Sequence, residues 1–146
     1  MKLLPENIEY IIIHSSRTRN PKPHQGVRLL DKVHRMRRAF SWNLGGHDCY
    51  HHFVIRTDGV VEEARPLDVP GNHTLGFNEK SISVCYMGGV DRRGFPVDTR
   101  TDAQKEAMRE LLDRLQEQFP KAVAVLHSQL APRRSGGCPG FSLEQL

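Results

Sequence analysis

Two apolar runs, far apart in the chain, each end in a histidine followed by a serine. They are residues 11–15, Ile-Ile-Ile-His-Ser, and residues 123–128, Val-Ala-Val-Leu-His-Ser. Continuous β-branched runs of this length are typical of strands buried on both faces of an α/β sheet. Open α/β sheets build their sites at the carboxyl ends of such strands. If the two strands are parallel neighbours, we expect His14 and His127 to lie close together.

A cysteine in a glycine-rich segment follows the second run. Cys138 comes eleven residues after His127, within Ser-Gly-Gly-Cys-Pro-Gly at 135–140, which is flexible enough to fold back towards the histidines. Two imidazoles and one thiolate suit zinc, and three protein ligands leave a fourth tetrahedral position open, as in catalytic sites. The pattern predicts one Zn²⁺ per chain, bound by His14, His127 and Cys138. The alternative is that both histidines are hydrogen-bonded loop residues and the cysteine is inert and buried.

Length and composition describe a globular protein rather than a fibrous or disordered one. The 146 residues fit a single domain over 1–146, and three irregularly spaced cysteines argue against a disulfide framework. The first residues lack the apolar core of a signal peptide, and no run is long enough to span a bilayer. We therefore expect synthesis in the cytoplasm without a signal peptide and no membrane insertion.

The net charge of +4 favours polyanionic partners, among them anionic polymers of the cell wall. Basic residues concentrate at 28–38 and at 133–134. No recognition helix, zinc-finger spacing or aromatic RNA-binding signature accompanies them, so we expect no nucleic-acid partner.

Hydrophobic periodicity predicts the order β-α-β-β-β-α-β and hence the α/β class, with a central mixed sheet flanked by helices. Asp58-Gly59 predicts a hairpin between its two flanking strands. The loop 65–80 is long for a compact domain, which tends to indicate function. The strands are expected at 8–13, 52–56, 60–64, 81–86 and 122–126, and the helices at 26–38 and 101–119.

Taken in order, several short motifs resemble the zinc-dependent N-acetylmuramoyl-L-alanine amidases, which include phage endolysins and are related in fold to the peptidoglycan recognition proteins. The motifs are Ile-Ile-Ile-His-Ser-Ser at 11–16, Phe-Val-Ile-Arg-Thr-Asp-Gly at 53–59, Gly-Asn-His at 71–73, Asn-Glu-Lys-Ser-Ile-Ser-Val at 78–84, Gly-Gly-Val-Asp at 88–91, His127, and Cys-Pro-Gly-Phe at 138–141. The resemblance covers nearly the whole chain, and the combination is specific although each piece alone is weak.

The resemblance implies a hydrolase that cleaves the amide between N-acetylmuramic acid and L-alanine in peptidoglycan. It places His14, His127 and Cys138 on the zinc ligands, in agreement with the spacing. It also implies action on the cell wall during lysis of the host, and we expect a monomer.

The sequence departs from the family pattern at the entrance to the second strand. Phage members usually have a tyrosine there, close to the zinc water, whereas this chain has Tyr50-His51-His52-Phe53. Counting back from Phe53 puts His51 in the tyrosine position, where a histidine could act as a general base or an oxyanion donor. A bulge of one residue would restore Tyr50 instead. Both remain candidates for the catalytic position.

A second departure concerns the lysine that cleaving relatives usually have two residues before the cysteine. This chain has Gly136 at that position. Arg133 or Arg134, in the longer loop before the cysteine, could supply a cation to the same oxyanion. The missing lysine also leaves a non-catalytic module of the same fold, which binds peptidoglycan or a protein partner, as the alternative function.

The remaining histidines and Asn78 have two interpretations each. His73 and Asn78, in the long loop, would contact peptide or sugar, or would instead close the loop by hydrogen bonds. His47, Cys49 and His51 would share one face of an extended strand, which leaves a separate metal site as an alternative. His24 and His34 are expected to be solvated.

Overall fold

The protein is seen in a computed structural model that describes residues 2–37 and 49–146. Within these residues one sheet has the strand order β3-β2-β4-β1-β5. Four strands run parallel, and β3 pairs antiparallel with β2, so the sheet is mixed as predicted. The strands are β1 (Tyr10–Ser15), β2 (Phe53–Ile55), β3 (Val61–Glu63), β4 (Ser81–Tyr86) and β5 (Val123–Leu126).

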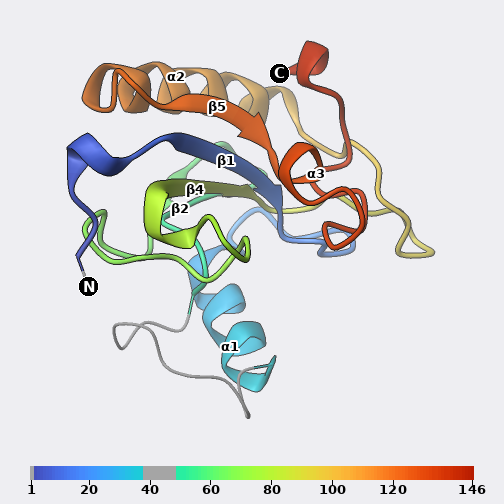
Figure 1. Cartoon of the computed structure of the whole chain (residues 1–146). Helices are drawn as coiled ribbons and strands as arrows, with labels where there is room; N and C mark the ends of the chain where they lie inside the picture. The colour runs from blue at the N-terminus through green and yellow to red at the C-terminus, as the bar shows by residue number, and fades with distance from the viewer. Residues whose placement is uncertain (1, 38–48) are drawn as a thin grey trace.

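Two helices lie on opposite faces of this sheet and form a three-layer arrangement (Figure 1). On one face, α2 (Asp102–Gln118) packs Met108, Leu111 and Leu115 against the sheet in the larger apolar cluster. On the other face, α1 (Val27–Arg37) contributes Leu30 to a smaller cluster. The described part of α1 ends at Arg37. No helix in the described ranges has both the length and the apolar character needed to cross a membrane.

The start of α2 is fixed by two side chains. Thr101 caps the helix by accepting a hydrogen bond from the Gln104 N–H, and the Gln104 side chain accepts one from the Thr101 N–H, so the two residues form a capping box. The same Gln104 side chain is fully buried, and its Nε2 donates to the carbonyl oxygens of Ile55 and Met87 at 3.1 and 3.0 Å. The helix start is therefore tied to the carboxyl ends of β2 and β4.

The first and last strands are parallel neighbours, as their sequences predict. The register pairs Tyr10 with Val123 and Ile13 with Leu126. β1 lies in the interior of the sheet, between β4 and β5, and its three isoleucines are fully buried. β5 lies at the sheet edge and Val123 is 57% exposed, so the expectation that this run is buried on both faces is wrong. An edge strand has a neighbour on one side only.

A short helix that the sequence analysis did not anticipate, α3 (His127–Leu130), follows β5 without a break. It turns the chain so that the next loop comes back beside β1 (Figure 1). The Ser128 N–H then donates to the Cys138 carbonyl at 3.0 Å. Single 3-10 turns lie at Pro5–Asn7, Asn78–Lys80 and Leu143–Gln145.

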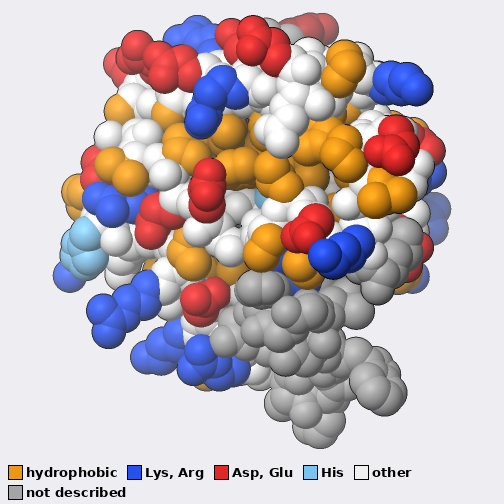
Figure 2. Space-filling view, turned by 90° about the vertical axis from the view of Figure 1, so that its left-hand side faces the viewer, with side chains coloured by type: hydrophobic (Ala, Val, Ile, Leu, Met, Phe, Trp, Pro, Cys, Tyr) orange, Lys and Arg blue, Asp and Glu red, His pale blue; other side chains and the backbone are white. Residues whose placement is uncertain are grey.

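Figure 2 shows the side of the molecule at the amino ends of the parallel strands, opposite the end where α3 lies. Hydrophobic side chains form a band across the middle of this side, with acidic and basic side chains above and below the band. The two histidines singled out by the sequence lie towards the other end, where β1 and β5 finish.

Candidate metal centre

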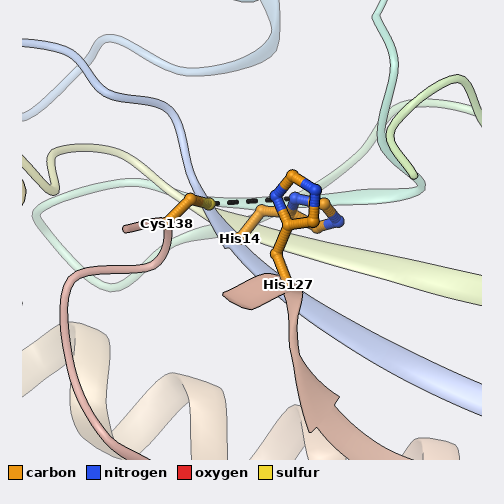
Figure 3. Close-up of side chains that lie close together, drawn as sticks. All are labelled: His14, His127 and Cys138. Carbon is orange, nitrogen blue, oxygen red and sulfur yellow. Dashed lines mark hydrogen bonds between the residues drawn. The ribbon is translucent and has the colours of Figure 1, made fainter. Parts of the chain in front are cut away.

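Three donor atoms from His14, His127 and Cys138 all lie within 4.8 Å of one another. Cys138 Sγ is 3.9 Å from His14 Nδ1, and the two imidazole rings have centroids 4.4 Å apart (Figure 3). Tetrahedral ligands of zinc, with bonds of about 2.0–2.3 Å, are separated by about 3.3–3.6 Å. The Sγ–Nδ1 separation of 3.9 Å is within a few tenths of an ångström of that spacing, and no pair of the three donors lies farther apart than 4.8 Å.

The strand register explains where the two histidines point. His14 is not beyond β1 but inside it, paired with Cys85 of β4. Paired residues on parallel strands share a face, so His14 lies on the face covered by α1, where Cys85 belongs to the smaller apolar cluster. His127 follows Leu126, the partner of Ile13, and so reaches the level of His14.

The cysteine is held by backbone contacts on both sides. Cys138 Sγ accepts a hydrogen bond from the Ser15 N–H at 3.1 Å. Its neighbour Pro139 follows a cis peptide bond, and the Pro139 carbonyl accepts from the buried Tyr86 hydroxyl at 2.6 Å. The loop that bears the thiol is therefore anchored to β1 and to β4.

The second nitrogen of His14 is engaged by the long loop. His14 Nε2 lies 3.0 Å from His73 Nδ1, and the Thr74 hydroxyl is 3.0 Å from the same His73 atom. Asn78 Oδ1 accepts from the N–H groups of His73 and Thr74, each at 2.9 Å. Ligand histidines ordinarily have their other ring nitrogen fixed in this way. Asn78 closes the loop and His73 orients His14, while their contact with substrate stays a prediction.

His127 differs from His14 because its Nδ1 is buried and has no hydrogen-bond partner in the described part of the chain. Leaving a buried nitrogen unsatisfied costs about 1–3 kcal/mol. A metal ion at the point where the three donors converge would satisfy this atom. The donor set and the unpartnered nitrogen therefore both fit a metal.

Burial also favours the protonation states that a metal needs. Burial, and then the neighbouring histidines His51, His73 and His127, hold the pKa of His14 well below 6.5. The pKa of His127 is lowered as well, by burial and by the charge of Arg17. Neutral imidazoles keep the lone pair that binds metal. Burial raises the pKa of the Cys138 thiol, hydrogen bonds from Ser15 and the charge of Arg17 oppose that rise, and a bound cation would favour the thiolate further.

Tyr50 and His51 are the two candidates for the catalytic position before β2, and His51 is the one that lies beside the proposed metal ligand His14. Its ring centroid is 4.9 Å from that of His14, and its Nδ1 lies 2.6 Å from the Ser83 hydroxyl. The Tyr50 ring instead stacks on His34 at 3.7 Å, and its hydroxyl donates to the His34 carbonyl at 3.3 Å. The geometry thus favours His51 for a role beside the metal ligands.

Two further histidines lie beside the residues around the proposed metal ligands: the His34 ring is next to His51, and the His52 ring is next to His73. His52 has both ring nitrogens bonded to backbone, since its Nδ1 accepts from the Ser83 N–H at 3.0 Å and its Nε2 donates to the Val69 carbonyl at 2.8 Å. His34 is buried, and its Nδ1 accepts from the Tyr50 N–H at 3.0 Å, so the expectation that it is solvated is wrong. His47, and with it the alternative second metal site, lies outside the described residues.

The arginines before Cys138 lie away from the three donors. Arg133 and Arg134 are exposed and, with Leu75 and Leu130, line a surface hollow. Neither makes a hydrogen bond or an ion pair with another described residue. The arginine whose charge acts on His127 and Cys138 is Arg17. Arg17 was not among the candidates that the sequence predicted, although its position three residues after His14 was a usable signal.

The chain is similar to known proteins in sequence and in structure. A family model described as N-acetylmuramoyl-L-alanine amidase matches residues 4–141. The endolysin of Klebsiella phage KP32 is 37% identical over 135 residues, which are 92% of this chain and 82% of that protein. The endolysin of Escherichia phage T7 is 34% identical over 140 residues, which are 96% of this chain and 85% of that protein.

Solved structures share the fold at lower sequence identity. The N-acetylmuramoyl-L-alanine amidase LysC from Clostridium intestinale superposes with a TM-score of 0.73 at 22% identity, over 97% of this chain and 82% of that one. The Apis mellifera PGRP-SA structure gives 0.75 at 20% identity, over 97% and 81%. On the extent of the family match and the identity to the phage endolysins, the chain belongs to the N-acetylmuramoyl-L-alanine amidase family.

Proposed function

We propose that the protein is a zinc-dependent amidase that hydrolyses the bond between N-acetylmuramic acid and L-alanine in peptidoglycan. The observation that carries the proposal is the convergence of three donors on one point, with the His127 Nδ1 left unpartnered there. Two histidines and one cysteine are a zinc ligand set with one open position. Membership of the amidase family supports both the reaction and the substrate.

In this proposal His14, His127 and Cys138 hold the metal. When bound, zinc supplies Lewis acidity, which polarises an amide carbonyl and lowers the pKa of a water molecule. His73 keeps the His14 ring in place through its contact with Nε2. The Ser15 N–H orients the sulfur.

His51 is the residue that we assign to proton transfer. Its pKa lies well below 6.5, because of burial and then of the neighbouring histidines His73, His34, His52 and His127, so it is neutral at pH 7 and can accept a proton. Its Nδ1 faces the Ser83 hydroxyl, which leaves Nε2 to take the proton of the attacking water. The same nitrogen then returns that proton to the alanine nitrogen as the carbon–nitrogen bond breaks. The products are a lactyl carboxylate and a free L-alanine amino terminus.

The substrate class implies a place of action. The phage endolysins that the chain resembles support action on the host cell wall, with peptidoglycan as the partner. We further propose that the protein works as a monomer.

One observation favours a second function, a module that binds peptidoglycan without cleaving it. Gly136 offers no side chain at the position where cleaving relatives usually have a lysine. Under this alternative the fold and the metal would be retained and hydrolysis lost.

Incubation of the purified protein with peptidoglycan sacculi separates the two functions. For the amidase we expect release of stem peptides with a new L-alanine amino terminus, which stops with a chelator and returns with Zn²⁺. Tight binding to sacculi without release in any condition would establish the binding module instead.

The ligand set has its own test. Cys138→Ser should reduce zinc, measured by atomic emission, from one per chain to well below one, because a hydroxyl is a much poorer zinc ligand than a thiolate. His24→Ala, at an exposed histidine in the loop before α1, is the matched control and should keep full zinc. Full occupancy in Cys138→Ser would show that the ligand set is wrong.

A further inference from the structure

The guanidinium of Arg17 lies directly against the loop that bears Cys138. A Cβ built on Gly136 would be 2.5 Å from Arg17 Nη1 and 3.1 Å from both Cζ and Nη2. A side chain at position 136 would therefore displace the guanidinium. Glycine at this position leaves the space that Arg17 fills.

Arg17 makes no hydrogen bond and no ion pair with any other residue in the described ranges, and it is exposed. An arginine has five N–H donors in a planar fork, and these remain available to a ligand. The backbone nevertheless holds the residue in one place. The neighbouring Ser16 N–H donates to the Tyr86 carbonyl at 2.9 Å, and the Thr18 N–H donates to the Gly88 carbonyl at 3.1 Å.

The backbone of Arg17 is itself unusual. Its φ is 55°, in the left-handed region, which is uncommon for a residue with a side chain. Such conformations cost about 1–3 kcal/mol and cluster at functional sites, where the surrounding structure maintains them. This conformation turns the chain directly after β1, three residues beyond His14.

The charge of Arg17 acts on two of the three proposed metal ligands. It contributes, after burial, to the lowered pKa of His127. It also opposes the effect of burial on the Cys138 thiol, together with the hydrogen bonds from Ser15. The charge of Arg17 therefore acts on two of the three proposed ligands.

We propose that Arg17 is a catalytic residue that stabilises the oxyanion formed on the amide carbonyl during hydrolysis. This inference rests on the proposed amidase function. Water adds to the carbonyl carbon and gives a proton to His51, and the π electron pair of the carbonyl moves onto its oxygen, which becomes negative. The free guanidinium donors, which lie against Gly136 in the loop that bears Cys138, bind that oxygen. A charged donor fixed where negative charge develops lowers the barrier because it need not reorganise during the reaction.

Arg17→Ala should lower kcat for release of stem peptides by about 10²–10³-fold, the loss typical of removing one oxyanion donor. Zinc content should remain at one per chain, because Arg17 is not among the ligands. Arg17→Lys keeps the charge but loses the fork and should recover part of the rate. Arg19→Ala, at a second exposed arginine in the same loop, is the matched control and should stay within about 3-fold of wild type, as expected for a surface change.

A binding measurement tests the same assignment without turnover. A phosphinate analogue of the scissile amide places a tetrahedral anion at the reacting centre. Arg17→Ala should weaken its affinity by about the factor by which kcat falls, and should leave the affinity for the product peptide nearly unchanged.

The glycine gives an independent test in which Arg17 itself is kept. Gly136→Ala should push the guanidinium aside and lower kcat, by up to about 10²-fold for a displacement near 1 Å. Gly94→Ala is the control for backbone strain, because Gly94 also has a positive φ and its Cβ would contact the Arg19 guanidinium at 3.0 Å. In the double variant of Arg17→Ala and Gly136→Ala the two losses should not add, since both remove the same interaction.

The outcomes separate this inference from the function on which it rests. No release of stem peptides by the wild-type protein would overturn the amidase proposal itself. Release by wild type with an Arg17→Ala kcat within 3-fold would overturn the role of Arg17 alone. A raised KM with unchanged kcat would also overturn it, because that pattern assigns Arg17 to ground-state binding.

Discussion

β1 lies in the interior of the sheet, between β4 and β5, whereas β5 lies at its edge, although both lead into a histidine and a serine. His14 is buried within its strand, and its Nε2 is fixed by His73. His127 is half-buried at the first position of α3, and its Nδ1 has no partner among the described residues. One ligand is therefore preorganised by the protein, and the other depends on the metal. The same local sequence acquires a different role from its position in the sheet.

The largest difference between β1 and β5 should appear in how much a substitution in each strand lowers the free energy of unfolding. Ile13→Ala removes a fully buried side chain of β1 and should lower the free energy of unfolding by about 2–5 kcal/mol. Val123→Ala, at the exposed start of β5, should change it by at most about 0.5 kcal/mol. Urea unfolding followed by circular dichroism measures both. Equal losses would remove the distinction between a central and an edge strand.

A second prediction extends the comparison to protonation. Both ring nitrogens of His52 are hydrogen-bonded to the backbone, whereas Nδ1 of His127 has no partner among the described residues. Burial lowers the pKa of His52 from 6.5 to about 4, although its bond to Val69 acts in the other direction. The unfolded chain therefore binds more protons between these values. Stability supplied by a neutral His52 is complete above about pH 6.5 and is lost as the pH falls towards 4, by up to about 3 kcal/mol.

Urea titrations of the metal-free protein from pH 7 to pH 4 measure this loss. His52→Gln should flatten the profile, and His127→Gln should change its slope less. A His52→Gln profile that runs parallel to wild type would show that this histidine is not the source.

The smallest predicted effect concerns the metal-free stability of the two ligand variants. His14→Ala breaks the contact with His73 and should cost about 1–3 kcal/mol. His127→Ala removes an unsatisfied buried nitrogen and should cost less than about 1 kcal/mol. Both variants should lose zinc. Thermal unfolding with a chelator present measures the pair, and a larger loss in His127→Ala would reverse the assignment of the preorganised ligand.

Much of the fold could be predicted from the sequence because it depends on local patterns. Alternation over 81–86 predicts β4 to the residue, and Asp58-Gly59 predicts the antiparallel pair β2 and β3. The sequence offers Thr99 and Thr101 as caps for the second helix, and the structure begins α2 with Thr101 as its cap. The edge position of β5 could not be predicted, because Val-Ala-Val-Leu is equally apolar in the middle of a sheet and at its rim.

The candidate site was predictable in its donors but not in its surroundings. Strand ends and a glycine-rich loop point to His14, His127 and Cys138. The burial of His34 depends on its stacking with Tyr50, and the position of Arg17 depends on a left-handed turn packed over Gly136. These contacts join segments far apart in the chain, so local sequence patterns do not contain them.

The carboxamide of Gln104 joins three segments through hydrogen bonds that cannot be broken one at a time without leaving a buried group unsatisfied. Fraying of the first turn of α2 would take the Gln104 amide away from the Met87 and Ile55 carbonyls, although the Ile55 carbonyl would keep its bond from the Met87 N–H. Separation of β2 from β4 would leave part of the buried amide without an acceptor. These segments should therefore open as one cooperative unit, and local fluctuations should be confined to the loops beyond it.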